Sequence, residues 1–237
     1  MKPFSSILIF SAIVLFTSSC RKRIEGSGNF ITQERPVSPF TEVESDGSFT
    51  VIVKEDSIQK VTIYGEDNIL PHITTRVEAN RLRIYYDDDL FKKFKEHGIT
   101  IRISVPQLNN VSLTGSGKVY SEGTINSTVF FAVISGSGEI DLTLNCIEAR
   151  TFISGSGDIS LHGTSPGATH SVSGSGDVKA FDMLSDDVDV TIGGSGNCDV
   201  HAEKTLKVKI SGSGDVRYIG SPLVQTSISG SGSVKPL

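Results

Sequence analysis

The sequence predicts an all-β protein built as a β-solenoid. Three observations lead to this fold class: a repeated Gly-Ser-Gly triplet, apolar residues at fixed places around it, and little helical periodicity. A nearly constant repeat indicates an architecture in which each unit buries its apolar side only by stacking on the next. The intervals between triplets are 21, 19, 19, 20, 18 and 18 residues, and the seven triplets begin at Gly115, Gly136, Gly155, Gly174, Gly194, Gly212 and Gly230.

The residues around each triplet alternate between apolar and polar, which is typical of a strand with one buried side. Two positions before the first glycine the residues are Leu113, Ile134, Ile153, Val172, Ile192, Ile210 and Ile228. Two positions after the second glycine they are Val119, Ile140, Ile159, Val178, Cys198, Val216 and Val234. Each repeat is therefore predicted to form a strand, a corner and a second strand. We assign the glycines to the corner because glycine reaches positive φ without a Cβ clash.

The length of the repeat selects among the all-β and α/β architectures. A unit of about 19 residues is too short for a βαβ crossover, which needs about 30. It can hold the two or three short strands of one solenoid coil, with equivalent residues stacked about 4.8 Å apart. An antiparallel sandwich is the competing interpretation, and it predicts less uniform repeats because successive hairpins alternate in direction.

The first residues predict an export signal followed by a tether. Lys2 precedes a mostly apolar run over 4–16, which ends in Thr17-Ser18-Ser19-Cys20. This pattern indicates a secretory signal at 1–19. It is similar to bacterial lipoprotein signals, in which Cys20 would be lipidated and would begin the mature chain. An ordinary signal peptide is the alternative, and a membrane span is disfavoured because it needs about 20 apolar residues. Residues 20–29 then form the tether.

Residues 30–110 are also rich in predicted strands, but they carry no triplet. Alternating residues predict strands at 40–44, 49–54, 60–64, 73–77, 81–86 and 99–105. We expect one helical turn at 67–71 and a short helix or loop at 87–96. Because a solenoid end needs a cover for its core and its edge strand, residues 30–110 form either a cap or irregular first coils. Residues 111–237 form the regular solenoid.

Several segments together carry a family resemblance. They are 35–40 (Arg-Pro-Val-Ser-Pro-Phe), 47–51 (Gly-Ser-Phe-Thr-Val), 67–70 (Asp-Asn-Ile-Leu), 82–84 (Leu-Arg-Ile) and the serial Ser-Gly-Ser-Gly-Asp. Over about residues 27–235 the chain resembles the DUF2807 family, also called the putative auto-transporter adhesin head GIN domain, which is common in exported proteins of Bacteroidetes. The resemblance implies a right-handed parallel β-helix with a β-rich N-terminal part. It implies no catalytic residues.

The residue after each triplet is the sharpest candidate for a binding site. These residues would stack into an acidic row of the oxygen ligands that Ca²⁺ prefers, namely Glu139, Asp158, Asp177, Asn197 and Asp215. In the alternative, each side chain accepts hydrogen bonds from nearby backbone N–H groups of the turn. We expect this structural role and no metal or other cofactor, because the calcium-binding β-roll places its Asp differently in a repeat of about nine residues.

The sequence contains no recognisable catalytic constellation. A nucleophile needs a base at hydrogen-bond distance, and the seven triplet serines have no matched histidines. One local group of carboxylates predicts a polar loop: Asp182, Asp186, Asp187 and Asp189. His162 and His201 occupy one coil position two coils apart, roughly 10 Å at the strand spacing, which is too far for one metal ion.

The two cysteines of the mature chain are not expected to form a disulfide. Cys146 and Cys198 lie at different points of the coil and more than two coils apart, which is beyond the reach of a bridge. We expect both to be small buried residues.

Charge and signal together suggest the functional class. The net charge is −5, and no basic patch large enough for nucleic acid is present; residues 21–23 (Arg-Lys-Arg) predict a solvated part of the tether. Our hypothesis is a non-enzymatic outer-membrane lipoprotein, attached to the membrane by its lipid. It would present a rigid surface for adhesion to a glycan or an envelope protein. The alternatives are a carbohydrate-active β-helix enzyme and a periplasmic accessory protein that binds another envelope protein.

Overall fold

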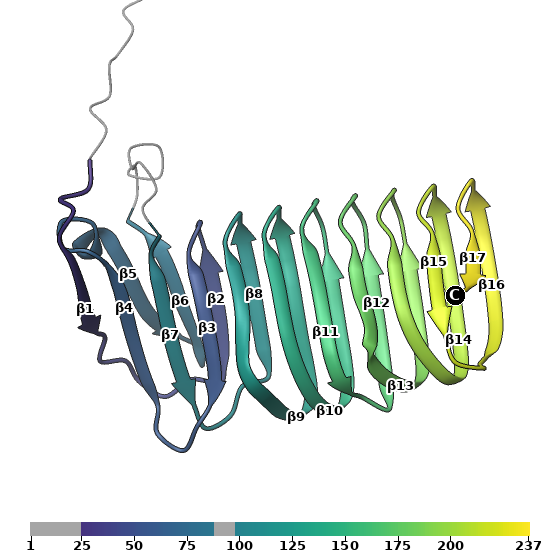
Figure 1. Ribbon diagram of the computed structural model, residues 1–237, viewed down its shortest axis with the longest axis horizontal. Helices are drawn as coiled ribbons and strands as arrows, with labels where there is room; N and C mark the ends of the chain where they lie inside the picture. The colour runs from purple at the N-terminus through teal and green to yellow at the C-terminus, as the bar shows by residue number, and fades with distance from the viewer. Residues whose placement is uncertain (1–24, 88–97) are drawn as a thin grey trace, which may run out of the picture.

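The computed structural model describes residues 25–87 and 98–237. The signal peptide, Cys20 and most of the element expected at 87–96 lie outside the described residues. The fold is the predicted right-handed parallel β-helix, a solenoid of about seven turns with about 68% strand. Figure 1 shows the coils side by side along one axis, with the N-terminal strands at one end and the C-terminal strands at the other.

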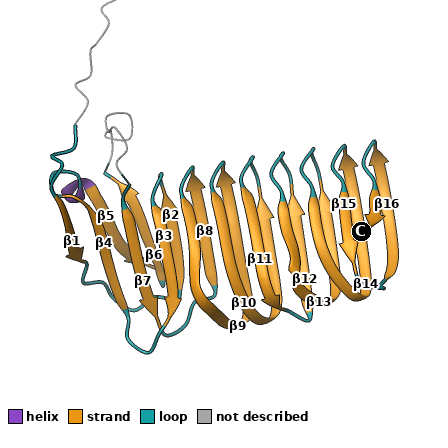
Figure 2. Ribbon diagram, in the orientation of Figure 1, coloured by secondary structure: helices purple, strands orange, loops and turns teal. Residues whose placement is uncertain are grey.

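Each regular coil has one strand segment before its Gly-Ser-Gly corner and one after it. A bend at the opposite edge then joins the second segment to the first segment of the next coil (Figure 2). We call the sheet of segments that follow the corners face A, and the sheet of segments that precede the corners face B. Four long strands run from face A through the bend into face B: β9 (Lys118–Gly136), β10 (Glu139–Ile153), β13 (Val178–Ile192) and β14 (Cys198–Gly212).

The shorter strands complete the two faces. Face A also contains β1 (Phe30–Glu34), β4 (Lys60–Glu66), β7 (Thr100–Val105), β3 (Thr50–Glu55), β11 (Asp158–Thr164), β15 (Val216–Ile219) and β17 (Val234–Pro236). Face B also contains β5 (Ile73–Glu78), β6 (Arg81–Tyr86), β2 (Glu42–Asp46), β8 (Asn110–Gly115), β12 (Gly167–Val172) and β16 (Leu223–Gly230).

The apolar residues around the corners form the predicted ladders inside the solenoid. In face A, for example, Val119, Ile140 and Ile159 are aligned by the parallel register. Of the fourteen apolar positions beside the triplets, all but two are buried. The exceptions are Ile228, which is 42% exposed, and the half-buried Val234, and both belong to the last coil. The C-terminal end of the core is therefore partly open.

The coil formed by residues 42–55 lies between two coils that come later in the sequence. β2 pairs in parallel with both β6 and β8, and β3 pairs in parallel with both β7 and β9. After β3 the chain builds β4 to β7 toward the N-terminal end, and it then returns past the 42–55 coil to begin β8 (Figure 1). This crossing breaks the sequential order of the coils.

The 42–55 coil has a corner that the triplet pattern missed. It consists of Gly47, Ser48 and Phe49, and it stacks on the first triplet. The Gly47 N–H donates to the carbonyl of Thr114 (2.9 Å), and the Lys118 N–H donates to the carbonyl of Phe49 (2.8 Å). A fully buried phenylalanine thus takes the place of the second glycine.

Antiparallel strands and a short turn close the N-terminal end of the core. β4 pairs antiparallel with β7 and β1, and β5 pairs antiparallel with β6. Between β4 and β5, the 3-10 turn η1 (Leu70–His72) buries Leu70, flanked by the buried Ile69 and Ile73. Residues 25–29 lie against this end, since the Ser27 N–H donates to Oδ1 of Asn68 (3.0 Å).

Close stacking of the corners, and not the φ angle, explains most of the triplet glycines. Only Gly115, Gly212 and Gly230 among them have a φ between +20° and +160°, so our assignment of positive φ is wrong for the others. A Cβ atom on Gly174 would lie 2.0 Å from the carbonyl oxygen of Gly155. The same oxygen accepts a hydrogen bond from the Ser175 N–H (2.9 Å). Each corner is therefore bonded to the one before it at a distance that excludes a side chain.

The two cysteines are free and buried, as the sequence predicts. Burial raises the pKa of both the Cys146 and the Cys198 thiol. Cys198 belongs to the face A ladder, in register with Val178 and Val216, so it acts as a small apolar residue of the core.

Candidate functional site

The polar residues after the triplets stack into a row along the corner edge of face A, and their side chains bond to the next coil. Oδ1 of Asp158 accepts from the Asp177 N–H (3.2 Å), and Oδ1 of Asp177 accepts from the Asn197 N–H (2.8 Å). Oδ1 of Asn197 accepts from the Asp215 N–H (3.1 Å), and Oδ1 of Asp215 accepts from the Ser233 N–H (2.8 Å). The row links successive coils from side chain to backbone.

Two carboxylates of this row also pair with lysines. Glu139 contacts Nζ of Lys118 (2.7 Å), and Asp158 contacts Nζ of Lys179 (2.7 Å). The hydrogen bonds from Ser233 lower the pKa of Asp215. Within residues 25–87 and 98–237, no three side chains of His, Cys, Asp or Glu converge as metal ligands.

Replacing Asp177 tests whether the row is structural. Asp177→Ala should lower the free energy of unfolding by about 1 kcal/mol, because the backbone N–H and the side-chain amide of Asn197 both lose their acceptor. Asp177→Asn should stay close to the wild type, since an amide oxygen still accepts. Urea unfolding with and without millimolar Ca²⁺ measures both effects. Stabilisation by calcium that both variants lose would contradict the structural role.

The acidic group of the sequence analysis is spread along β13, which runs from face A into face B. The group Asp182, Asp186, Asp187 and Asp189 is not a loop, since β13 runs continuously through all four positions. Asp186 pairs with Lys204 (2.9 Å), and Asp187 accepts from the Thr205 hydroxyl (2.6 Å). Tertiary pairing to β14 thus holds this polar segment in an extended conformation.

The histidines of face A contact carboxylates. His162 lies between Asp141 (3.1 Å) and Asp182 (3.5 Å), and His201 contacts Glu203 (2.9 Å). The triplet serines are exposed along the corner edge, and their backbone N–H groups hold the stacked corners together.

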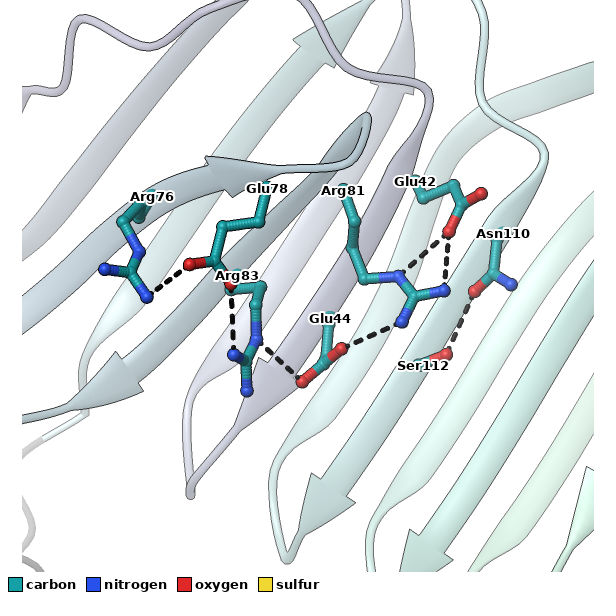
Figure 3. Close-up of polar contacts among 8 residues, drawn as sticks. All are labelled: Glu42, Glu44, Arg76, Glu78, Arg81, Arg83, Asn110 and Ser112. Atoms are coloured by element: carbon teal, nitrogen blue, oxygen red, sulfur yellow. Dashed lines mark hydrogen bonds and ion pairs between the residues drawn. The ribbon is translucent and has the colours of Figure 1, made fainter.

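Face B carries a network of charged side chains at its N-terminal end (Figure 3). Arg76 contacts Glu78, which also pairs with Arg83 (3.3 Å). Glu44 bridges Arg83 (3.1 Å) and Arg81 (3.2 Å). The network ends at Glu42, whose Oε2 accepts from Nε (2.9 Å) and Nη2 (2.7 Å) of Arg81. The hydrogen bond to Glu42 is the main reason that the pKa of Arg81 is raised.

Next to this network, face B has outward apolar side chains and a hollow. Phe131 and Val133 are half-buried and Phe152 is 40% exposed. The guanidinium carbon of Arg150 lies 5.5 Å from the centre of the Phe131 ring. A pocket of about 380 Å³ borders Phe131, and its lining includes Glu42, Gln107, Asn110 and Thr128. This hollow is our candidate binding site.

One signal in the sequence points to this region. Most outward positions near the corners are polar, whereas Phe131, Val133 and Phe152 are outward and apolar. Unusual apolar residues on an exposed sheet face mark candidate contact surfaces. The hollow itself depends on the chain crossing between β7 and β8, and no local sequence pattern predicts that crossing.

Comparisons with known proteins identify the class to which this solenoid belongs. Residues 39–222 match the model of the family described as "Putative auto-transporter adhesin, head GIN domain", DUF2807. The chain therefore belongs to this family, as the sequence motifs suggested. No curated protein matches the chain.

Solved structures of Bacteroidetes proteins share the fold. A putative adhesin from Bacteroides fragilis is 25% identical with a TM-score of 0.83, covering 90% of this chain and 100% of that one. A putative lipid binding protein from Parabacteroides distasonis is 24% identical (TM-score 0.75), covering 91% of this chain and 100% of that one. A putative adhesin from the same organism is 22% identical (TM-score 0.72), with the same coverage.

Proposed function

We propose that the protein is an exported, lipid-anchored and non-enzymatic binding protein of the cell envelope, an adhesin-type scaffold of the outer membrane. One observation carries the proposal. The described chain begins at the capped end of the solenoid, and the C-terminus lies toward the opposite end (Figure 1). A lipid on Cys20, shortly before the described residues begin, would leave both faces available to ligands along the solenoid.

Family membership and the sequence signal support this proposal. The family is described as "Putative auto-transporter adhesin, head GIN domain", and residues 1–20 have the pattern of a lipoprotein signal. In the part of the chain that the structure describes, we find no helix long and apolar enough to cross a membrane.

The chemistry of the described surface supports a binding role rather than turnover. The histidines of face A contact carboxylates instead of the triplet serines. Catalysis by nucleophilic attack needs a base beside the nucleophile. Release of sugars from any polysaccharide by the purified protein would overturn the non-enzymatic assignment.

The anchor is tested by comparing two cysteine variants in a bacterial host that lipidates exported proteins. Cys20→Ala should abolish labelling by a fatty-acid analogue and should move the protein from the membrane fraction to the soluble fraction. Cys198→Ala is the matched control, because Cys198 is buried in the core, and it should keep both label and location. Membrane association of Cys20→Ala equal to that of the wild type would refute the anchor.

The adhesive role needs the protein on the outer surface of the cell. Protease added to intact cells should cleave the wild-type protein while a periplasmic marker stays intact. Full protection would favour the alternative of a periplasmic accessory protein, which pull-down from envelope extracts would then identify by its partner.

A further inference from the structure

We infer that the hollow between Glu42 and Phe131 on face B is a site for an uncharged sugar unit of a glycan, an assignment that rests on the proposed binding role. The hollow arises where residues 106–109 cross from β7 to β8, beside the bend of β9 at Thr128. Its volume of about 380 Å³ falls in the range of small-molecule pockets. The crossing thus creates a concave surface on an otherwise regular sheet.

One wall of the hollow is an aromatic ring that its neighbours hold in place. Along face B, Asn110, Phe131 and Arg150 follow one another in the strand register. Nε of Arg150 donates to Glu148 (2.7 Å), and its guanidinium lies against the ring of Phe131. Arg150 therefore packs on the β10 side of Phe131, and the hollow lies on the β8 side. A ring in this position offers the apolar surface against which the C–H groups of a sugar pack.

The remaining lining supplies uncharged hydrogen-bonding groups. Oδ1 of Asn110 accepts from the Ser112 hydroxyl (3.0 Å), and its amide nitrogen points away from Ser112 (Figure 3). Gln107, Asn109 and Thr128 add amide and hydroxyl groups, which both donate and accept. Among the residues that the structure describes, nothing donates to the buried Oδ1 of Asn109. Such a set matches the adjacent hydroxyl groups of a sugar.

The charges at the hollow select against ionised ligands. Glu42 is the one charged residue of the lining that the structure describes, and Arg81 bonds to it through two nitrogens. The carboxylate of an acidic sugar would approach Glu42 and be repelled, whereas a cation would have to compete with Arg81. An uncharged sugar meets neither penalty.

The test compares lining variants with matched controls in the full-length lipidated protein, purified in detergent. A glycan array with neutral and acidic oligosaccharides identifies the best neutral binder, and calorimetry then measures its affinity. Phe131→Ala and Asn110→Ala should each weaken binding about tenfold or more. Phe152→Ala, an aromatic one coil away, and Gln225→Ala, at the register position of Asn110 in β16, should bind like the wild type. Because Phe131→Ala also removes packing, Gln107→Ala on the exposed connection provides a further lining variant.

Three outcomes would overturn the site: neutral binding that survives all the lining variants, preference for acidic glycans, or no glycan binding at all. Adhesion of the same proteins to cell surfaces is measured in parallel. Adhesion that persists in the lining variants would overturn the sugar site and leave the proposed function standing. The proposed function would instead be overturned if the wild type does not adhere and Cys20→Ala associates with the membrane as the wild type does.

Discussion

Gly194→Ala should destabilise the protein by about 3 kcal/mol, whereas Gly193→Ala, one residue earlier in the same corner, should change stability by less than about 1 kcal/mol. A Cβ on Gly194 would lie 2.1 Å from the carbonyl oxygen of Gly174, a backbone atom that cannot move away alone. A Cβ on Gly193 would meet nothing nearer than 3.9 Å. Neither residue has a φ between +20° and +160°, so the two differ in contact and not in backbone strain.

The other coils show that the position of Gly193 accepts a side chain. The equivalent residue, directly before the first triplet glycine, is a threonine or a serine in the other six repeats: Thr114, Ser135, Ser154, Ser173, Ser211 and Ser229. The same close approach recurs in the next corner, where a Cβ on Gly212 would lie 2.1 Å from the carbonyl oxygen of Gly194.

Urea unfolding followed by far-ultraviolet circular dichroism measures the two variants under identical conditions. Solenoids can lose structure coil by coil, so the midpoints are compared together with the shape of the transitions. Equal effects of the two substitutions would refute the idea that close stacking of the corners requires glycine.

The repeat was predictable from the sequence because its signal is local. Two apolar positions flank every triplet, and in parallel stacking the same residues always meet their own equivalents. The strand predicted at 81–86 coincides with β6 (Arg81–Tyr86), since polar and apolar residues alternate over Arg81, Leu82, Arg83 and Ile84. The uniform length and pattern of the repeats therefore favour a solenoid over a sandwich, and the parallel register of the strands confirms the solenoid.

The departures from prediction all involve contacts between distant parts of the chain. The corner at 47–49 lacks a second glycine, and its equivalence to the triplets appears only when β3 lies beside β9. The positive φ predicted for the glycines is wrong for most of them, because a single sequence shows φ preference but not the approach of the next coil. The hollow on face B joins Glu42 to Phe131, and it could not be predicted without the order in which the coils stack.

Acid should destabilise the protein through one buried histidine. His170 lies inside the face B ladder, fully buried, between Thr151 and Val190 of the adjacent coils. Burial lowers its pKa from 6.5 to about 4. Between these two values the unfolded chain binds a proton that the folded protein does not. The free energy of unfolding therefore falls as the pH drops through this window, by about 3 kcal/mol in total, and the contribution is constant above pH 6.5 or so.

A double variant isolates this contribution without leaving a buried polar group unpaired. The Thr151 hydroxyl bonds to Nδ1 of His170 (2.9 Å), so His170→Val alone would leave the buried Thr151 hydroxyl without this hydrogen-bond partner. The variant Thr151→Val/His170→Val extends the ladder of Ala132 and Val190 with apolar residues. It should lose less stability than the wild type between pH 6.5 and 4, with the difference approaching about 3 kcal/mol.

The control for this experiment is a histidine on the outer surface. His162→Gln, whose side chain lies on the outside of face A between two carboxylates, should retain the steep acid response of the wild type, because His170 remains buried. Urea unfolding at half-unit steps of pH gives the slopes for all three proteins. If the double variant had the same slope as the wild type, acid sensitivity would have to come from the carboxylates, such as Asp215, whose lowered pKa stabilises the corner row until protonation removes it.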